Sequence, residues 1–161
     1  MKDLMKLADE CIAELRAARI PLQTVRNWKI SNSRKSLWGL CQVVAPGIYD
    51  ITISESLLQD DVEEQAIKNT IAHELLHTVE GCMNHGRYWH KLANLVNQRC
   101  PGYHVKGRTS AEDKGIQISY KYLLRCTSCN TTVGRHRKSR FVEHPELYLC
   151  SRCSGKFERI Q

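Results

Sequence analysis

The sequence predicts an α+β protein: a helix, a small sheet and two further helices form one domain, and a small metal-stabilised ribbon follows. Three observations carry this prediction. Helical and strand-like hydrophobic periods succeed one another over residues 4–96. Two histidines four residues apart lie within one helical pattern, and two Cys-x-x-Cys pairs stand near the C-terminal end. With 161 residues, 42% of them hydrophobic, the chain can bury one ordinary core plus a small appendage.

A helix and three strands are predicted to come first. The helix stops before Pro21, and its apolar stripe consists of Leu4, Leu7, Cys11 and Leu15. Alternating runs predict strands over Val25–Ile30, Leu37–Val44 and Ile48–Ile53, with turns at Asn32-Ser33 and Pro46-Gly47. We expect Leu37–Val44 to be an edge strand, since an edge can hold an extended polypeptide by backbone pairing alone.

Two amphipathic helices are predicted to follow the strands. The buried stripe of the first consists of Val62, Ile67, Ile71, Leu75 and Val79. Asp60 and Asp61 suit the N-terminus of this helix, and Gly81 suits its end. The second helix carries Trp89, Leu92, Ala93 and Val96 on one face and stops at Cys100-Pro101-Gly102.

The run His73-Glu74-Leu75-Leu76-His77 predicts a catalytic zinc site on the first of these two helices. Residues four apart share a helix face, so His73 and His77 can hold one metal ion. Zinc lowers the pKa of a bound water to about 7, and Glu74 is placed to take the proton of that water. A glutamate between two such histidines has no packing reason to be there, which argues against a core helix with incidental histidines.

A catalytic zinc needs a third protein ligand and an open fourth position. We favour His85, because the Gly86 after it marks a turn at the entrance of the next helix. His90, Glu80 and Cys82 remain as alternatives. A longer metzincin motif is excluded, because Glu80 and Met83 stand where that motif needs Gly and His.

The segments HELLH and NHGRYW, together with the upstream stretch SLWGLCQVVAPGIYDITIS, resemble the SprT-like (Spartan) zinc metalloproteases. The resemblance spans roughly residues 5 to 155, and its specific part is the HELLH and His-Gly unit. It implies a zincin-like fold in which His85 completes the zinc site. It also implies protein substrates attached to or assembled on DNA, including covalent DNA–protein crosslinks.

Two cysteine pairs predict a second, structural zinc site. Cys126 and Cys129 are separated by twenty residues from Cys150 and Cys153, which is the spacing of a four-thiolate zinc ribbon. A segment of this size cannot bury enough surface to fold alone, so the metal would supply folding free energy. His136 and His144 are expected on the surface. The total expectation is two Zn²⁺ ions, one catalytic and one structural.

The predicted domain boundaries follow from these motifs. Residues 1–103 form the metalloprotease domain, residues 104–120 form a linker or wrapping loop, and residues 121–161 form the ribbon. Tyr103 and His104, just after the second helix of the site, are candidates for stabilising an oxyanion, although ordinary loop roles are the simpler expectation.

Positive charge is concentrated in the ribbon. Residues 1–103 hold 12 basic and 12 acidic residues, whereas residues 121–161 hold 9 and 3, which accounts for nearly all of the net charge of +7. The basic residues Arg135, Arg137, Lys138 and Arg140 lie in one run. Nearby aromatic residues, namely Phe141, Tyr148, Tyr120 and Tyr122, favour contact with phosphates and bases of single-stranded DNA.

These observations favour a zinc-dependent endopeptidase that the ribbon brings to DNA. The alternatives are a non-proteolytic DNA-binding adaptor that keeps zinc for structure, and a general cytosolic metallopeptidase whose basic tail binds RNA or acidic proteins. No apolar run approaches the roughly 18 residues of a membrane span, and the charged start does not resemble a secretory signal. Cysteines arranged for metal rather than for disulfides predict a cytoplasmic protein without membrane partners, associated with the nucleoid in a bacterial or archaeal cell.

Overall fold

The computed structural model describes residues 1–32, 37–109 and 120–161. The chain folds as two compact units, Met1–Gln117 and Ile118–Gln161. Ser33 of the first predicted turn and residues 110–119 of the predicted linker lie outside the described residues. Residues 104–109 lie with the first unit.

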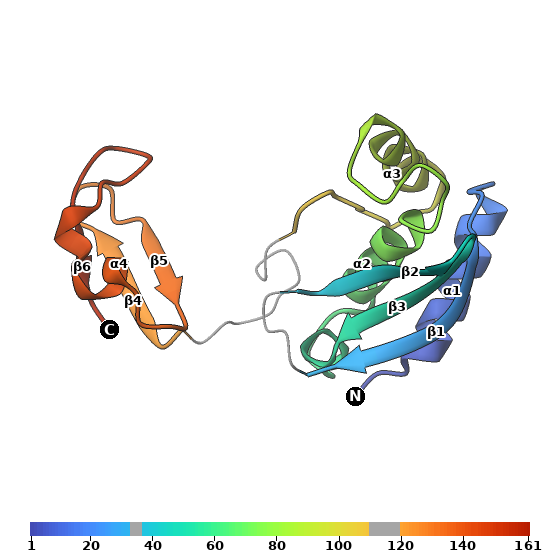
Figure 1. The fold of residues 1–161 in the computed structure, drawn as a ribbon, viewed down its shortest axis with the longest axis horizontal. Coiled ribbons are helices and arrows are strands. Elements are labelled where there is room, and N and C mark those ends of the chain that lie inside the picture. Colours follow the sequence, from blue (N-terminus) through green and yellow to red (C-terminus); the bar gives the residue numbers. More distant parts are fainter. Residues whose placement is uncertain (33–36, 110–119) are drawn as a thin grey trace. The chain divides into compact units, whose positions relative to one another are not determined.

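The first unit is a three-stranded sheet with helices packed on one face (Figure 1). Its elements are α1 (Leu4–Ala17), β1 (Thr24–Ser31), β2 (Gly39–Ala45), β3 (Ile48–Ser54), the 3-10 helix η1 (Glu55–Leu58), α2 (Glu64–Leu76) and α3 (Arg87–Arg99). The strand order is β1-β3-β2, with β1 parallel and β2 antiparallel to β3. The predicted α+β class is confirmed, and the strand predicted at an edge is the edge strand β2.

Helix α1 forms where its apolar stripe predicts it. Its N-cap is Asp3, whose carboxylate accepts hydrogen bonds from the backbone N–H groups of Met5 at 2.9 Å and Lys6 at 3.1 Å. The predicted stripe is the buried face of the helix and consists of Leu4, Leu7, Cys11 and Leu15. This face packs against α2 and helps to enclose the core.

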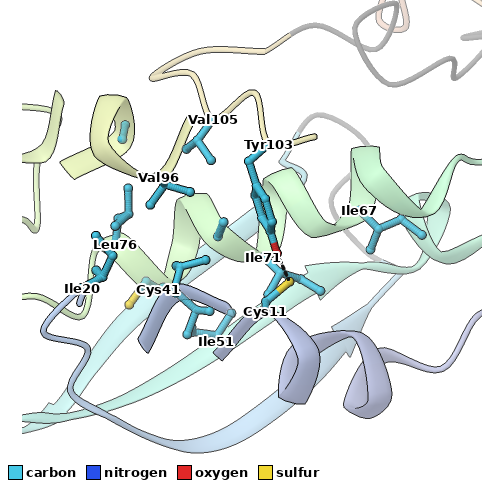
Figure 2. Close-up of a cluster of buried hydrophobic side chains, with 14 of the residues drawn as sticks. Cys11, Ile20, Cys41, Ile51, Ile67, Ile71, Leu76, Val96, Tyr103 and Val105 are labelled. Atoms are coloured by element: carbon cyan, nitrogen blue, oxygen red, sulfur yellow. Dashed lines mark hydrogen bonds between the residues drawn. The ribbon is translucent and has the colours of Figure 1, made fainter. Parts of the chain in front are cut away.

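The core of the first unit lies between the sheet, α1 and α2. Ile51 on β3 and Ile67, Ile71 and Leu75 on α2 are fully buried. Figure 2 shows these layers meeting, with Ile51 and Cys41 from the sheet beneath the α2 residue Ile71. Truncating such a side chain to alanine typically costs about 2–5 kcal/mol, so this core holds α2 rigidly in place.

Helix α2 is shorter than predicted at both ends. It begins at Glu64, because η1 and a turn occupy the preceding segment, in which Asp60 pairs with the N-terminal ammonium group at 2.9 Å. It ends at Leu76 rather than near Gly81. The Thr78 hydroxyl and backbone N–H both donate to the Leu75 carbonyl, at 2.7 and 3.0 Å, which tightens the chain into a turn. Asp60, Asp61 and Gly81 therefore lie outside the helix.

The second unit is a small antiparallel sheet with short helical turns. It contains β4 (Tyr122–Cys126), β5 (Thr132–Arg135), α4 (Arg140–Glu143), the 3-10 helix η3 (Pro145–Leu147) and β6 (Phe157–Arg159). The strand order is β5-β4-β6. Its small core consists of Leu124, Val142 and Phe157 with the cysteines Cys126 and Cys150. Such a core is too small to carry the fold by itself, as the sequence predicts.

None of the described helices is long and apolar enough to cross a membrane.

Candidate metal centres

Three histidine side chains of the first unit converge on one point. His73 lies in the last turn of α2, His77 is the C-cap residue of that helix, and His85 lies just before Gly86, the N-cap of α3. The Nε2 atom of His73 is 3.3 Å from Nε2 of His77 and 2.9 Å from Nε2 of His85. An Asx turn shapes this approach, because the Asn84 side-chain oxygen accepts from the Gly86 N–H at 3.1 Å.

This geometry fits zinc. Imidazole nitrogens about 2.0–2.1 Å from a tetrahedral zinc ion stand about 3.3 Å apart, close to the separations between the Nε2 atoms here. Backbone carbonyls accept hydrogen bonds from the other ring nitrogens: Cys82 from Nδ1 of His77 at 2.6 Å, and Lys106 from Nδ1 of His73 at 2.8 Å. A carbonyl can only accept, so each Nδ1 carries the proton and each Nε2 keeps its lone pair for a metal.

The surroundings of the rings favour their neutral form, which a metal ligand requires. Burial lowers the pKa of His77 below the usual value. Burial also lowers the pKa of His85, and the nearby His77, His90 and Arg108 lower it further.

The alternative third ligands lie elsewhere. His85, and not His90, lies next to His73 and His77. Among the described residues, these three form the only group of histidines that is close enough together to hold a metal ion. His90 lies on α3, where its ring contacts Trp89 edge to face at 5.3 Å. Cys82 is buried and contributes its carbonyl, while Glu80 is exposed.

Trp89 forms an apolar floor beneath the three histidines. Its indole is fully buried, and its ring centroid lies 4.7–5.7 Å from those of His73, His77 and His85. Its N–H has no hydrogen-bond partner in the part of the chain that the structure describes. The sequence pattern identified Trp89 only as a core residue of α3, because periodicity does not reveal which rings a buried indole touches.

Glu74 points into the same site from α2 and is 6% exposed. Its carboxylate lies against the backbone of Gly39 at the start of β2, where a Cβ atom would stand 2.5 Å from Oε1. A side chain at residue 39 would displace the carboxylate, so Gly39 lets the edge strand approach Glu74 in its observed position. The sequence motifs did not point to Gly39, although a glycine within a strand pattern often marks such a close approach.

The three histidines and Glu74 line a cleft of about 490 Å³. One wall is the start of the edge strand, residues 37–41, and the other is formed by residues from His104 to Thr109. Cys41 faces the cleft next to Glu74, and burial together with the Glu74 charge raises the pKa of its thiol to about 12. That thiol is therefore protonated at neutral pH, and it lies outside the cluster that the three histidines form.

The two candidates for oxyanion stabilisation, Tyr103 and His104, point in opposite directions. Tyr103 points away from the cleft toward Cys11 (Figure 2), and its hydroxyl hydrogen-bonds with Cys11 and the Glu14 carboxylate. The Tyr103 hydroxyl therefore does not face the cleft, which agrees with the simpler expectation of an ordinary role for this residue. His104, the next residue of an extended chain, has the opposite orientation and lines the cleft.

The second unit brings its four cysteines together. All four Sγ atoms lie within 4.8 Å of one another, with Cys126 and Cys153 3.4 Å apart and Cys129 and Cys150 3.7 Å apart. Thiolates about 2.3 Å from a tetrahedral zinc stand about 3.8 Å apart, and a disulfide needs about 2.05 Å. The arrangement fits a closed four-thiolate zinc site.

Local hydrogen bonds prepare this site for thiolates. The Thr131 hydroxyl, 3.2 Å from the sulfur, lowers the pKa of Cys129 to about 6. The backbone N–H of Cys129 lowers the pKa of Cys126. The Gly155 N–H also lowers the pKa of Cys153, but the sulfurs of Cys129 and Cys126 outweigh it and raise that pKa to about 12. A divalent cation relieves this repulsion among thiolates, as a zinc site requires.

The basic residues of the ribbon are exposed, namely Arg135, Arg137, Lys138 and Arg140. Arg135 lies over the ring of Phe141, 5.4 Å from its centroid, and that ring contacts Tyr148 edge to face. Lys138 pairs with Glu143 at 2.8 Å.

Two other aromatic residues proposed for base stacking are engaged within the ribbon. The ring of Tyr120 lies tilted against that of His136, with centroids 5.0 Å apart, and occupies the space above Gly134 where a Cβ would be. Tyr122 is half-buried beneath the cations of Lys121 and Arg159. Tyr148, 38% exposed, remains available for stacking.

Replacing Cys126 and Cys129 by serine should unfold residues 121–161 while the first unit stays folded, because the ribbon core is too small without its metal. Metal analysis should find two zinc ions per parent chain and one per mutant. Limited proteolysis and NMR should show loss of order confined to the ribbon. A double mutant that keeps both ions would contradict the four-thiolate site.

A family model described as the SprT-like family matches residues 5–109, which include the three histidines, Glu74 and both walls of the cleft. No solved structure matches the chain. The matched segment covers more than half of the chain and carries a metallopeptidase-type site. The chain therefore belongs to the SprT-like family.

Proposed function

We propose that this protein is a zinc-dependent endopeptidase that acts on proteins associated with or crosslinked to DNA. Membership of the family supports a metallopeptidase-like domain in general. The observation that carries the proposal is the position of Glu74, whose buried carboxylate lies in the cleft beside three converging histidines. Three of these four groups, His73, Glu74 and His77, come from one short segment at the end of α2.

The proposed ligands of the catalytic zinc are His73, His77 and His85. When bound, zinc supplies Lewis acidity that polarises a scissile carbonyl and acidifies water at the site. Glu74 acts as the general base: it takes the proton of the attacking water and then passes it to the leaving amine. Burial beside Gly39 holds the carboxylate in one orientation, so little motion is needed between these two transfers.

The edge strand offers a way to bind polypeptide. Among the described residues β2 pairs only with β3, so its other edge has backbone groups directed away from the sheet. Residues 37–41 at its start form a wall of the cleft. A substrate segment that adds to this edge as a further strand would run past Glu74, and recognition through the backbone tolerates many sequences.

The ribbon is the proposed DNA-binding part. Exposed cations in the run from Arg135 to Arg140 provide phosphate contacts, and Tyr148 offers a face for an unpaired base. The Lys138–Glu143 pair is exposed, and such pairs contribute only about 0–1 kcal/mol, so a phosphate can displace the glutamate. Single-stranded DNA is the preferred partner in this proposal.

Glu74→Gln should abolish cleavage of a protein substrate while zinc content and thermal unfolding stay close to the parent values. The change removes the base without removing a ligand, and loss of a general base typically costs about 10²- to 10⁴-fold in rate. Rates should be measured with and without single-stranded and double-stranded DNA. An adaptor would show no cleavage by the parent, and a general peptidase would show cleavage that DNA does not change.

His85→Ala and His90→Ala form a matched pair within that experiment. His85→Ala should lose the zinc ion of the histidine site and the activity. His90→Ala should keep both, because His90 lies outside the group formed by His73, His77 and His85. Metal lost with His90→Ala and retained with His85→Ala would show that the third ligand is wrongly assigned.

Gly39→Ala should lower the cleavage rate by about 100-fold or more, since the new methyl group displaces the Glu74 carboxylate and a misplacement near 1 Å has that effect. Zinc affinity should change little, because the three histidines do not touch Gly39. The measurements are kcat, zinc content and the unfolding temperature. Thr52→Ala, on the opposite face of the neighbouring strand β3, is the control; equal rates for Gly39→Ala and the parent would remove Gly39 from the site.

DNA binding by the ribbon should weaken steeply with salt. If the four basic residues each neutralise one phosphate, log affinity for single strands should fall with log salt at a slope of roughly −3, or about 50-fold between 50 and 200 mM. Changing all four to glutamate should remove this dependence and any DNA stimulation, while cleavage without DNA survives. The control carries the same charge change on the first unit, at Lys6, Arg16, Arg19 and Lys91. Identical slopes for parent and ribbon mutant would place the DNA contact elsewhere.

A further inference from the structure

Residues 103–106, which we call the strap, form an extended segment after α3 that leads into one wall of the cleft. Their side chains alternate: Tyr103 and Val105 are buried, while His104 and Lys106 are exposed and line the cleft. Figure 2 shows Tyr103 and Val105 pointing down from the strap, Tyr103 toward Cys11. The strap has the alternation of a β-strand but pairs with no strand among the described residues.

Two asparagines replace the missing partner strand. Asn97 on α3 pairs with both backbone groups of Val105: its side-chain oxygen accepts from the N–H at 2.7 Å, and its NH₂ group donates to the carbonyl at 3.0 Å. Asn69 on α2 accepts from the N–H of His104 at 2.9 Å. A side-chain amide has the same donor and acceptor as a peptide group, so Asn97 satisfies the strap as a neighbouring strand would.

The side chain of Tyr103 anchors the start of the strap. Its hydroxyl hydrogen-bonds with Cys11 at 3.3 Å and with the Glu14 carboxylate, and Lys68 lies 5.9 Å from its ring centroid. Lys68 in turn pairs with Glu14 at 2.6 Å. Tyr103 thus connects the strap to α1 and α2. The contact with Asn69 follows at the next residue, His104, and the contact with Asn97 at Val105.

The strap ends at the group that orients His73. The carbonyl of Lys106, next in the chain after Val105, accepts the Nδ1 proton of His73 at 2.8 Å. The corresponding carbonyl for His77 belongs to Cys82, in the turn between α2 and α3, and does not depend on the strap. The two helical histidines therefore have independent supports.

We propose that Asn97 is a positioning residue for the metal site: it fixes Val105, and through Val105 the Lys106 carbonyl, so that His73 keeps its proton on Nδ1 and directs Nε2 at the metal. Asn97 lies outside the HELLH and His-Gly motifs. Among the described residues its side chain hydrogen-bonds with Val105 and not with the histidines. The inference rests on the proposed zinc site and not on which substrate is cut.

The test compares Asn97→Ala and Asn97→Asp with the parent in the full chain, with the ribbon already loaded with zinc. Alanine removes both hydrogen bonds, and aspartate keeps the acceptor but sets a carboxylate oxygen against the Val105 carbonyl. Each variant should bind zinc at the histidine site at least about 10-fold more weakly, the usual effect of removing a partner behind a ligand. Zinc titration against a competing chelator measures this, and Asn94→Ala, on the exposed face of the same helix, should match the parent.

A readout on the metal-free protein separates positioning from general loosening. Long-range proton–nitrogen NMR correlations report which ring nitrogen of each histidine carries the proton. In the Asn97 variants His73 should lose its preference for the Nδ1 proton, whereas His77 should keep it because Cys82 is not on the strap.

Unchanged zinc affinity in Asn97→Ala, or equal changes at His73 and His77, would overturn the proposal, and so would a parent that binds no zinc at these histidines. A parent that binds zinc there but cleaves no protein would refute the proposed function and leave the role of Asn97 intact.

Discussion

The requirement that three imidazoles meet through Nε2 governs the architecture of the first unit. Two of the three rings satisfy it by donating from Nδ1 to a backbone carbonyl, and those carbonyls belong to Cys82 and Lys106, far from each other along the chain. The turn after α2 must therefore close tightly, and the chain after α3 must return across the cleft. The core beneath α2 makes both possible, because it fixes the helix against which these carbonyls are aligned.

The position of Glu74, the proposed general base, places a second constraint on the sheet. A Cβ atom on residue 39 would stand 2.5 Å from the carboxylate, so the observed position of Glu74 requires a glycine at the start of β2. The same residue opens the edge strand into the cleft, so the element that positions the base also forms the surface proposed to bind substrate. In the proposed enzyme, the orientation of the base and the binding of polypeptide would both depend on the close contact between Gly39 and Glu74.

Much of this could be predicted from the sequence, because local patterns carry it. Apolar stripes locate α1 and the middle of α2, and the spacing of the histidines and cysteines identifies the groups that the structure brings together. The C-terminal end of α2 could not be predicted, because hydrophobic periodicity does not show that the Thr78 hydroxyl competes for the Leu75 carbonyl. The roles of Gly39, Trp89 and Asn97 could not be predicted from local patterns, because each acts through a contact with a residue distant in sequence. Tyr103 was only one of two oxyanion candidates, and the alternation along the strap turns it inward.

The two metal centres make opposite demands, and the difference bears on function. Four cysteine sulfurs around one point leave no open position on a tetrahedral metal, so a zinc ion held there would be structural. Three imidazoles at the floor of a cleft leave one side open to a substrate. Beside them the buried Glu74 carboxylate lies in the cleft against Gly39. A purely structural zinc site needs ligands but no general base next to them. The position of Glu74 is therefore the physical argument that favours the proposed hydrolysis over mere binding.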